Sequence, residues 1–139
     1  MKRSLKKIST AVILLLIILC NGSCEKDKGI LPYISFKTGA GYTSADASIA
    51  KNTAFMVGIT AAKSEGNDIL KTFTASVVYD ASTTSITAYS ETLTAAQGDN
   101  YAKDLVLTTR NQAGIEKWTF TITNKDGLVN SVTLTITVP

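Results

Sequence analysis

One cysteine stands where its thiol could be chemically modified. Cys24 directly follows residues 21–23, Asn-Gly-Ser, and small residues before a cysteine are what a lipoprotein signal peptidase requires. In that reaction the thiol takes a diacylglyceryl group, and cleavage exposes the new amine for a further acyl chain. Cys20 is the rival acceptor, but the bulky Leu19 does not fit the position ahead of the cut. We therefore predict that Cys24 is lipidated.

The residues before Cys24 have the composition of an export signal. Residues 1–7 carry four positive charges, and residues 11–20 are unbroken apolar sequence. A helix needs roughly 20 apolar residues to span a bilayer, so this run is too short and is typical of a signal peptide. We predict a signal peptide over residues 1–23 and a lipidated cysteine with a polar tether over 24–31. The alternative is an ordinary secretory cut that leaves Cys24 unmodified.

The acidic side chains form no pattern typical of catalysis. The chain has no histidine, and its acids are scattered singly, mostly in predicted turns: Asp46, Glu65, Asp68, Asp80, Glu91, Asp99, Asp104, Glu116 and Asp126. A catalytic carboxylate pair needs two acids held together, and calcium needs several oxygen ligands at short spacing. The sequence therefore predicts that the protein is not an enzyme, with no catalytic residues, no metal site and no cofactor.

Three tyrosines are the best candidates for ligand contact. Tyr42, Tyr89 and Tyr101 lie in or beside predicted loops, where exposed rings could stack on sugar faces. If they do, the three rings should gather at one exposed end of the domain. The alternative is that each ring only caps the core. The other strand aromatics are predicted core residues: Phe36, Phe55, Phe73, Tyr79, Trp118 and Phe120.

The elements that must position these residues are strands. Apolar and polar residues alternate with period two, most clearly over 118–123 and 132–138, which flank a turn at 124–127. Further strands are expected at 33–37, 55–61, 73–79, 83–93 and 101–110. We predict one all-β domain over residues 32–139, a two-sheet antiparallel immunoglobulin-like sandwich of about seven strands. A small closed β-barrel is the alternative.

Three parts of the chain resemble known families. Residues 114–127, with the strand that follows, resemble the last hairpin of PKD-like and related bacterial immunoglobulin-like domains. The Cys24 region resembles Bacteroidetes-type lipoproteins, in which a short charged cluster follows the cysteine, here residues 25–27, and the usual Leu three places before it is relaxed, here to Asn21. Residues 38–43 resemble the Thr-Gly-rich opening of uncharacterised members of that group. The resemblance implies an outer-membrane protein facing the cell exterior, and it supplies no activity.

These observations predict a lipid-anchored, cell-surface, non-catalytic binding or structural module that captures or adheres to a glycan or a protein. The alternative is an accessory or inhibitor subunit that docks on an enzyme or transporter of the envelope. Removal of residues 1–23 leaves ten basic residues against eleven acidic ones, a net charge of about −1, which argues against nucleic acid as a partner. The oligomeric state stays open.

Overall fold

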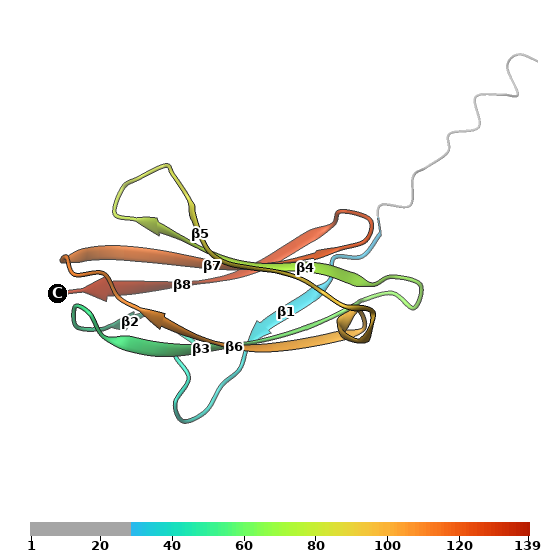
Figure 1. Ribbon diagram of the computed structural model, residues 1–139, viewed down its shortest axis with the longest axis horizontal. Coiled ribbons are helices and arrows are strands. Elements are labelled where there is room, and N and C mark those ends of the chain that lie inside the picture. The colour runs from blue at the N-terminus through green and yellow to red at the C-terminus, as the bar shows by residue number, and fades with distance from the viewer. Residues whose placement is uncertain (1–28) are drawn as a thin grey trace, which may run out of the picture.

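The computed structural model describes residues 29–139, so the predicted signal peptide and Cys24 lie outside the described residues. Two packed layers of strands make up this part of the chain (Figure 1). The strands are β1 (Tyr33–Phe36), β2 (Ala47–Ser48), β3 (Ala54–Ala62), β4 (Leu70–Tyr79), β5 (Ile86–Thr92), β6 (Asn100–Thr108), β7 (Gly114–Asn124) and β8 (Val129–Val138). A short 3-10 turn, η1 (Ala95–Gln97), precedes β6.

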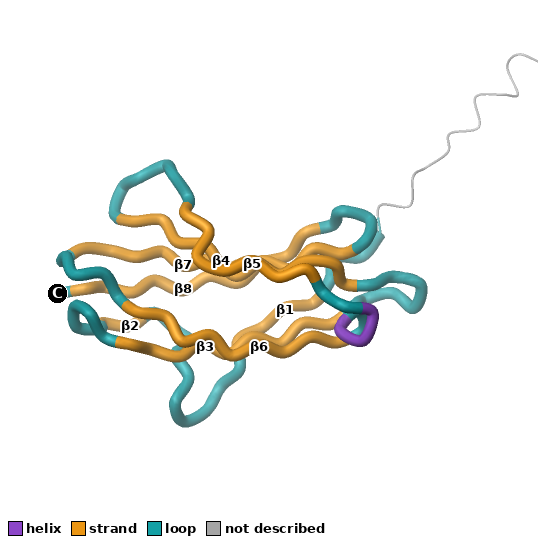
Figure 2. The backbone as a smooth tube through the Cα atoms, viewed as in Figure 1, coloured by secondary structure: helices purple, strands orange, loops and turns teal. Residues whose placement is uncertain are grey.

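The strand order confirms the predicted two-sheet sandwich. One sheet has the order β1-β3-β6, the other has the order β2-β8-β7-β4-β5, and the two do not close into a barrel. The chain crosses between the sheets after β1, β2, β3, β5 and β6, while β4–β5 and β7–β8 are hairpins within one sheet, as in immunoglobulin-like folds. Figure 2 shows the two layers with their connecting loops. Within residues 29–139, no helix has the length and apolar character needed to cross a membrane.

The predicted carboxyl-terminal hairpin is confirmed, and the side chain of Asn124 organises its turn. Its Oδ1 accepts hydrogen bonds from the backbone N of Asp126 and Leu128 at 3.1 and 2.8 Å. Its Nδ2 donates to Asp68 Oδ2 at 2.6 Å, and both side chains are buried. Gly127, at φ 79°, supplies the left-handed residue that the turn needs.

One strand was not predicted. β2 has only two residues, and it pairs with β8 in parallel, whereas the other pairings are antiparallel. It is held by Asp46, whose Oδ1 accepts a hydrogen bond from the backbone N of Thr135 at 2.7 Å. A two-residue strand is too short to show a period in the sequence.

The core lies between the sheets and is built from the inward residues of both. Phe55 meets Trp118 edge to face at 6.2 Å between ring centroids, and Phe36 meets Phe120 in the same way at 5.7 Å. Phe55, Phe73, Trp118 and Phe120 are buried, while Phe36 and Tyr79 are half-buried and pack against the core. Each fully buried aromatic side chain contributes about 1.5 to 3 kcal/mol, so these rings hold the layers together.

Candidate functional site

The outer face of the β1-β3-β6 sheet presents a regular array of side chains to solvent. Strand pairing places these outward residues in five rows: Ala54 with Thr108, Met56 with Val106, Gly58 with Asp104, Thr60 with Ala102 and Ser35, and Ala62 with Asn100 and Tyr33. Alternate residues of a strand lie about 6.7 Å apart, so the five rows extend about 27 Å along the strands. We call this surface the three-strand face.

The loop between β1 and β2 covers the middle of the three-strand face. Figures 1 and 2 show this loop projecting from the outer side of the sheet. It is tied down by hydrogen bonds from Lys37 N to Gly58 O at 2.8 Å and from Thr43 N to Met56 O at 2.7 Å. A Cβ at Gly58 would come within 2.7 Å of Cε1 of Tyr42, so glycine is what lets the Tyr42 ring lie on the sheet.

Asp104 links the loop to β6 by polar contacts. Its Oδ1 accepts a hydrogen bond from Lys37 Nζ at 2.7 Å, and its Oδ2 accepts one from the Tyr42 hydroxyl at 3.0 Å. Lys37 Nζ also lies 5.8 Å from the centroid of the Tyr42 ring. We call Lys37, Tyr42 and Asp104 the face triad.

Lys37 and Asp104 carry opposite charges near neutral pH, and the face triad is open to solvent. The hydrogen bond from Lys37 lowers the pKa of Asp104, with a smaller contribution from Tyr42, and the same bond to Asp104 raises the pKa of Lys37. The Asp104 side chain keeps 43% of its surface exposed. A ligand on this face therefore meets a carboxylate acceptor and an ammonium donor side by side.

Two shallow depressions flank the face triad, and each contains a tyrosine. The larger, about 540 Å³, is lined by Tyr42, Met56 and Val106 among others. The smaller, about 300 Å³, is lined by Tyr33 and by the small side chains of Ala62 and Ala102 among others. Tyr33 is 57% exposed and Val106 is 67% exposed, so both offer apolar surface to a partner.

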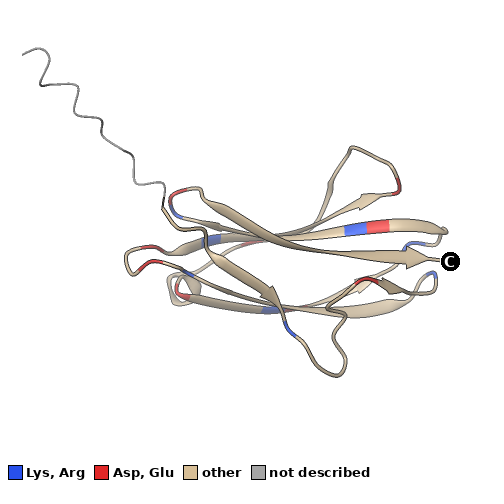
Figure 3. Ribbon diagram, turned by 180° about the vertical axis from the view of Figure 1, so that it is seen from behind, with Lys and Arg blue, Asp and Glu red and all other residues tan. Residues whose placement is uncertain are grey.

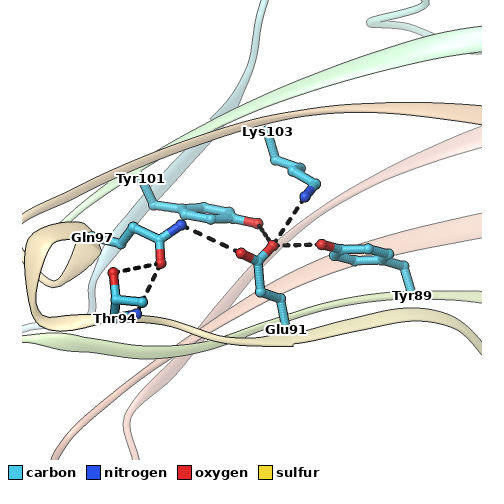
Figure 4. A network of polar contacts seen from close by, with 6 residues as sticks. All are labelled: Tyr89, Glu91, Thr94, Gln97, Tyr101 and Lys103. Carbon is cyan, nitrogen blue, oxygen red and sulfur yellow. Dashed lines mark hydrogen bonds and ion pairs between the residues drawn. The ribbon is translucent and has the colours of Figure 1, made fainter.

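Tyr89 lies outside both depressions, whereas Tyr101 is among the residues that line the smaller one, with its ring turned toward the core. Tyr89 and Tyr101 both donate hydrogen bonds to Oε2 of Glu91, and Lys103 Nζ lies 3.2 Å from the same oxygen (Figure 4). Gln97 donates to the other carboxylate oxygen at 3.3 Å. Tyr101 is only 4% exposed, and its ring packs 5.2 Å from that of Phe73. We call Tyr89, Glu91, Gln97, Tyr101 and Lys103 the Glu91 cluster.

The Glu91 cluster joins the free edges of the two sheets. β5 is the edge of one sheet and β6 is the edge of the other, and the cluster spans them. Hydrogen bonds from Tyr89 and Tyr101 lower the pKa of Glu91 to about 2, while burial and then the hydrogen bond to Glu91 raise the pKa of Tyr101. The three candidate tyrosines therefore do not gather at one exposed end. Tyr42 lies on the outer side of the sheet, whereas Tyr101 faces the core.

A third polar group closes the end of the sandwich near the carboxyl terminus. Arg110 makes a two-point contact with Asp80 at 2.8 and 2.6 Å, and its guanidinium lies 5.0 Å from the Tyr79 ring centroid. Glu116 is fully buried and accepts hydrogen bonds from the backbone N of Arg110 and from Trp118 Nε1. These side chains mainly satisfy one another, so we assign them a structural role.

The sequence reasoning missed most of the three-strand face. Tyr33, Lys37, Asp104, Met56 and Val106 were not singled out for binding. One signal was present, because Gly58 interrupts an otherwise apolar strand, and glycine inside a strand often marks the close approach of another group. Figure 3 shows that, in that view, charged residues lie mainly in turns and strand ends, which leaves few charges on the sheet faces.

Comparison with known proteins bears on the fold alone. No protein-family model matches the chain, and no curated protein matches it in sequence. Among solved structures, superoxide reductase (neelaredoxin) from Ignicoccus hospitalis is similar at a TM-score of 0.54 and 7% identity, covering 79% of this chain and 81% of that one. A variant of the same reductase is similar at a TM-score of 0.52 and 7% identity, over 84% and 86%. A β-glucosidase from Listeria innocua reaches 0.48 at 7% identity, over 76% of this chain and 16% of that one.

The prediction that the protein is not an enzyme is contradicted by this comparison. Chains named as superoxide reductases share the sandwich over most of their length, so a fold of this kind gives no argument against catalysis. At 7% identity the likeness shows the fold and transfers no activity. Within residues 29–139, no group of three or more His, Cys, Asp or Glu side chains is placed to hold a metal ion.

Proposed function

We propose that this protein is a lipid-anchored module of the outer membrane, facing the cell exterior, that binds a glycan on the three-strand face. The observation that carries the proposal is the arrangement of this face. Two depressions, each with a tyrosine, lie on either side of a charged triad on one sheet surface. Tyrosine rings suit the apolar faces of sugars, and the triad offers a donor and acceptors for hydroxyl groups.

The three-strand face offers two contact areas, one on each side of the β1–β2 loop. Its rows extend about 27 Å, and the loop covers the middle of them. The outer side of the five-stranded sheet differs, because threonines occupy its centre: Thr74, Thr119, Thr121, Thr133 and Thr135. That side has the polar, β-branched composition of an ordinary solvated sheet surface.

A glycan array with matched variants tests binding. We expect the wild-type protein to bind a subset of glycans, and we expect Tyr33→Ala and Tyr42→Ala each to weaken that binding about tenfold, equivalent to about 1.4 kcal/mol. Thr121→Ala, on the opposite sheet, is the control and should bind as wild type. Equal binding by the wild type and both tyrosine variants, or no binding to any glycan, would refute the glycan proposal.

Anchoring is tested separately by shaving intact cells with protease. We expect wild-type protein to be released from living cells and its amino-terminal peptide to carry acyl chains on Cys24, while Cys24→Ala should leave the membrane fraction. Mass spectrometry of that peptide supplies the readout. An unacylated Cys24, or a protein that protease cannot reach, would contradict the anchored, outward-facing part of the proposal.

A protein partner is the second candidate, and one observation favours it. β6 has nine residues and pairs only with β3, so its other backbone edge is free within the described part of the chain. Free edges can accept a further strand. The inward charge of Lys103 at this edge opposes such pairing, which is why we place the glycan first.

A further inference from the structure

Apolar side chains gather at the end of the sandwich where the described chain begins. Ile30 is 59% exposed, Leu31 is 51% exposed and Val129 is 49% exposed. These are large aliphatic side chains with about half or more of their surface in water, and each would be more stable against an apolar partner. We call Ile30, Leu31 and Val129 the end patch.

The segments that carry the end patch are fixed side by side. Asn130 Nδ2 donates a hydrogen bond to Pro32 O at 2.8 Å, which places the start of β8 beside the chain that enters β1. A Cβ at Gly29 would come within 2.7 Å of Leu128 Cδ1, so the two segments also touch before Ile30. The patch therefore draws its side chains from two parts of the chain that lie side by side at this end.

A loop on the third side holds the same segment in place. Glu65 Oε2 accepts a hydrogen bond from the backbone N of Ile30 at 3.1 Å, and Ser64 Oγ donates one to Leu31 O at 2.6 Å. With their backbone polar groups bonded in this way, the side chains of residues 30 and 31 project from an ordered base. The end patch is thus held in position before any partner arrives.

We propose that the end patch rests on the lipid bilayer, with Ile30, Leu31 and Val129 entering its interface. This inference rests on the membrane anchoring in the proposed function and not on glycan binding. Gly29 follows Cys24 by five positions, so this end of the domain lies at most about 17 Å from an acylated cysteine. The first described residues lie at the opposite end of the sandwich from the carboxyl terminus (Figure 1). No other end of the domain can come so close to the anchor.

The contact is apolar and not electrostatic. Near this end Lys63 pairs with Asp99 at 2.6 Å and Lys125 Nζ contacts the backbone oxygen of Asn67, while Asp126 is exposed in the β7–β8 turn. Partial entry of a few aliphatic side chains into the headgroup boundary supplements a lipid anchor. Because the contacting side chains are uncharged, the contact should persist at high salt.

Quenching by brominated lipid tests the contact on the full chain as cells process it. Protein is reconstituted into vesicles of brominated phosphatidylcholine, with tryptophan introduced in turn as Leu31→Trp and Val129→Trp. Ile115→Trp is the matched control, because Ile115 is 47% exposed and lies near the far end of β7. Wild-type emission from the buried Trp118 is subtracted as background.

We expect Leu31→Trp and Val129→Trp to lose more than half of their added emission, at low and at high salt, and Ile115→Trp to lose none. Equal quenching at both ends in protein that is bound to the vesicles would overturn the inference and leave the anchor intact. Protein that stays out of the vesicle fraction would overturn both, and mass spectrometry of Cys24 then shows whether the acyl chains are missing.

Discussion

Single residues at the open edges of the sandwich help the buried core to hold the two sheets together. A sandwich has edges where one sheet ends without a strand to close it, and here β5 and β6 are such edges. The carboxylate of Glu91 receives hydrogen bonds from two tyrosines and contacts Lys103, so one side chain joins both layers. An inward charge at an edge also discourages pairing with a second chain. Glu91 therefore has a structural role at a position where sequence alone suggests only a solvated acid.

The Glu91 cluster predicts a specific acid sensitivity. In the folded protein the pKa of Glu91 is about 2, against an ordinary 4.5, so the unfolded chain takes up the proton first as pH falls. The stabilisation by Glu91 is therefore complete above about pH 4.5 and is lost progressively toward pH 2. Glu91→Gln should lower the free energy of unfolding at pH 7 by about 1 to 2 kcal/mol and flatten its decline over this window.

Urea unfolding followed by Trp118 fluorescence across pH checks this expectation. Asp126→Asn removes an exposed turn carboxylate outside the cluster and is the control, with an acid profile expected to run parallel to that of the wild type. A Glu91→Gln profile that also runs parallel to the wild type would show that the cluster contributes nothing to acid stability.

At the scale of elements, the strands could be predicted because their alternation is long and regular. β3, β4, β7 and β8 each have nine or more residues, and most of their inward positions are apolar, with Glu116 and Asn124 of β7 as buried polar exceptions. β2 could not be predicted, because its pairing depends on Asp46 reaching Thr135 from 89 residues away. Contacts of that range leave no periodic trace in the sequence.

The three-strand face also combines residues that could be predicted from the sequence with residues that could not. Tyr42 was singled out correctly as a loop residue, but its partners Lys37 and Asp104 come from a strand end and from a distant strand. Only strand register brings Asp104 opposite Gly58 and beneath the loop. Tyr101 was expected near the surface because it stands next to a predicted turn, but it lies inward because it is on the same side of β6 as the buried Leu105 and Leu107.

The packing of the β1–β2 loop on β3 can be tested by a single substitution. Gly58→Ala places a methyl group against Tyr42 and Lys37, so the loop must move away from β3. We expect the hydrogen bond from Thr43 N to Met56 O to loosen and the Thr43 amide to exchange at least about tenfold faster, equivalent to a loss of about 1.4 kcal/mol of local stability. The global free energy of unfolding should change by less than about 1 kcal/mol, because alanine suits a strand better than glycine does.

Gly66→Ala is the matched control for this substitution, since a methyl group there meets nothing within 4 Å. Hydrogen exchange measured by NMR gives both the local and the global values. Unchanged exchange at Thr43 in Gly58→Ala would mean that Gly58 is not what keeps the loop on the sheet.

At the scale of the whole molecule, the proposed membrane contact and the proposed glycan contact lie on different parts of the surface. The end patch lies where the described chain begins, while the three-strand face runs along the side of the sandwich. If the end patch rests on a membrane, the strands stand at a steep angle to the bilayer plane, and the three-strand face points parallel to that plane. Neither arrangement follows from the sequence, because both depend on which loops the two-sheet order brings to the same end.

The position of β1 has a mechanical consequence. If a captured glycan pulls on β3 and β6 while the membrane holds the amino-terminal end, the load passes through the pairing of β1 with β3, which joins four residues on each strand. The two strands are antiparallel, and the pull runs along them, so it shears their hydrogen bonds together and does not open them one after another. A short strand loaded in shear resists more force than a longer one that is peeled. Such resistance would help a surface protein under flow to keep its hold on a ligand.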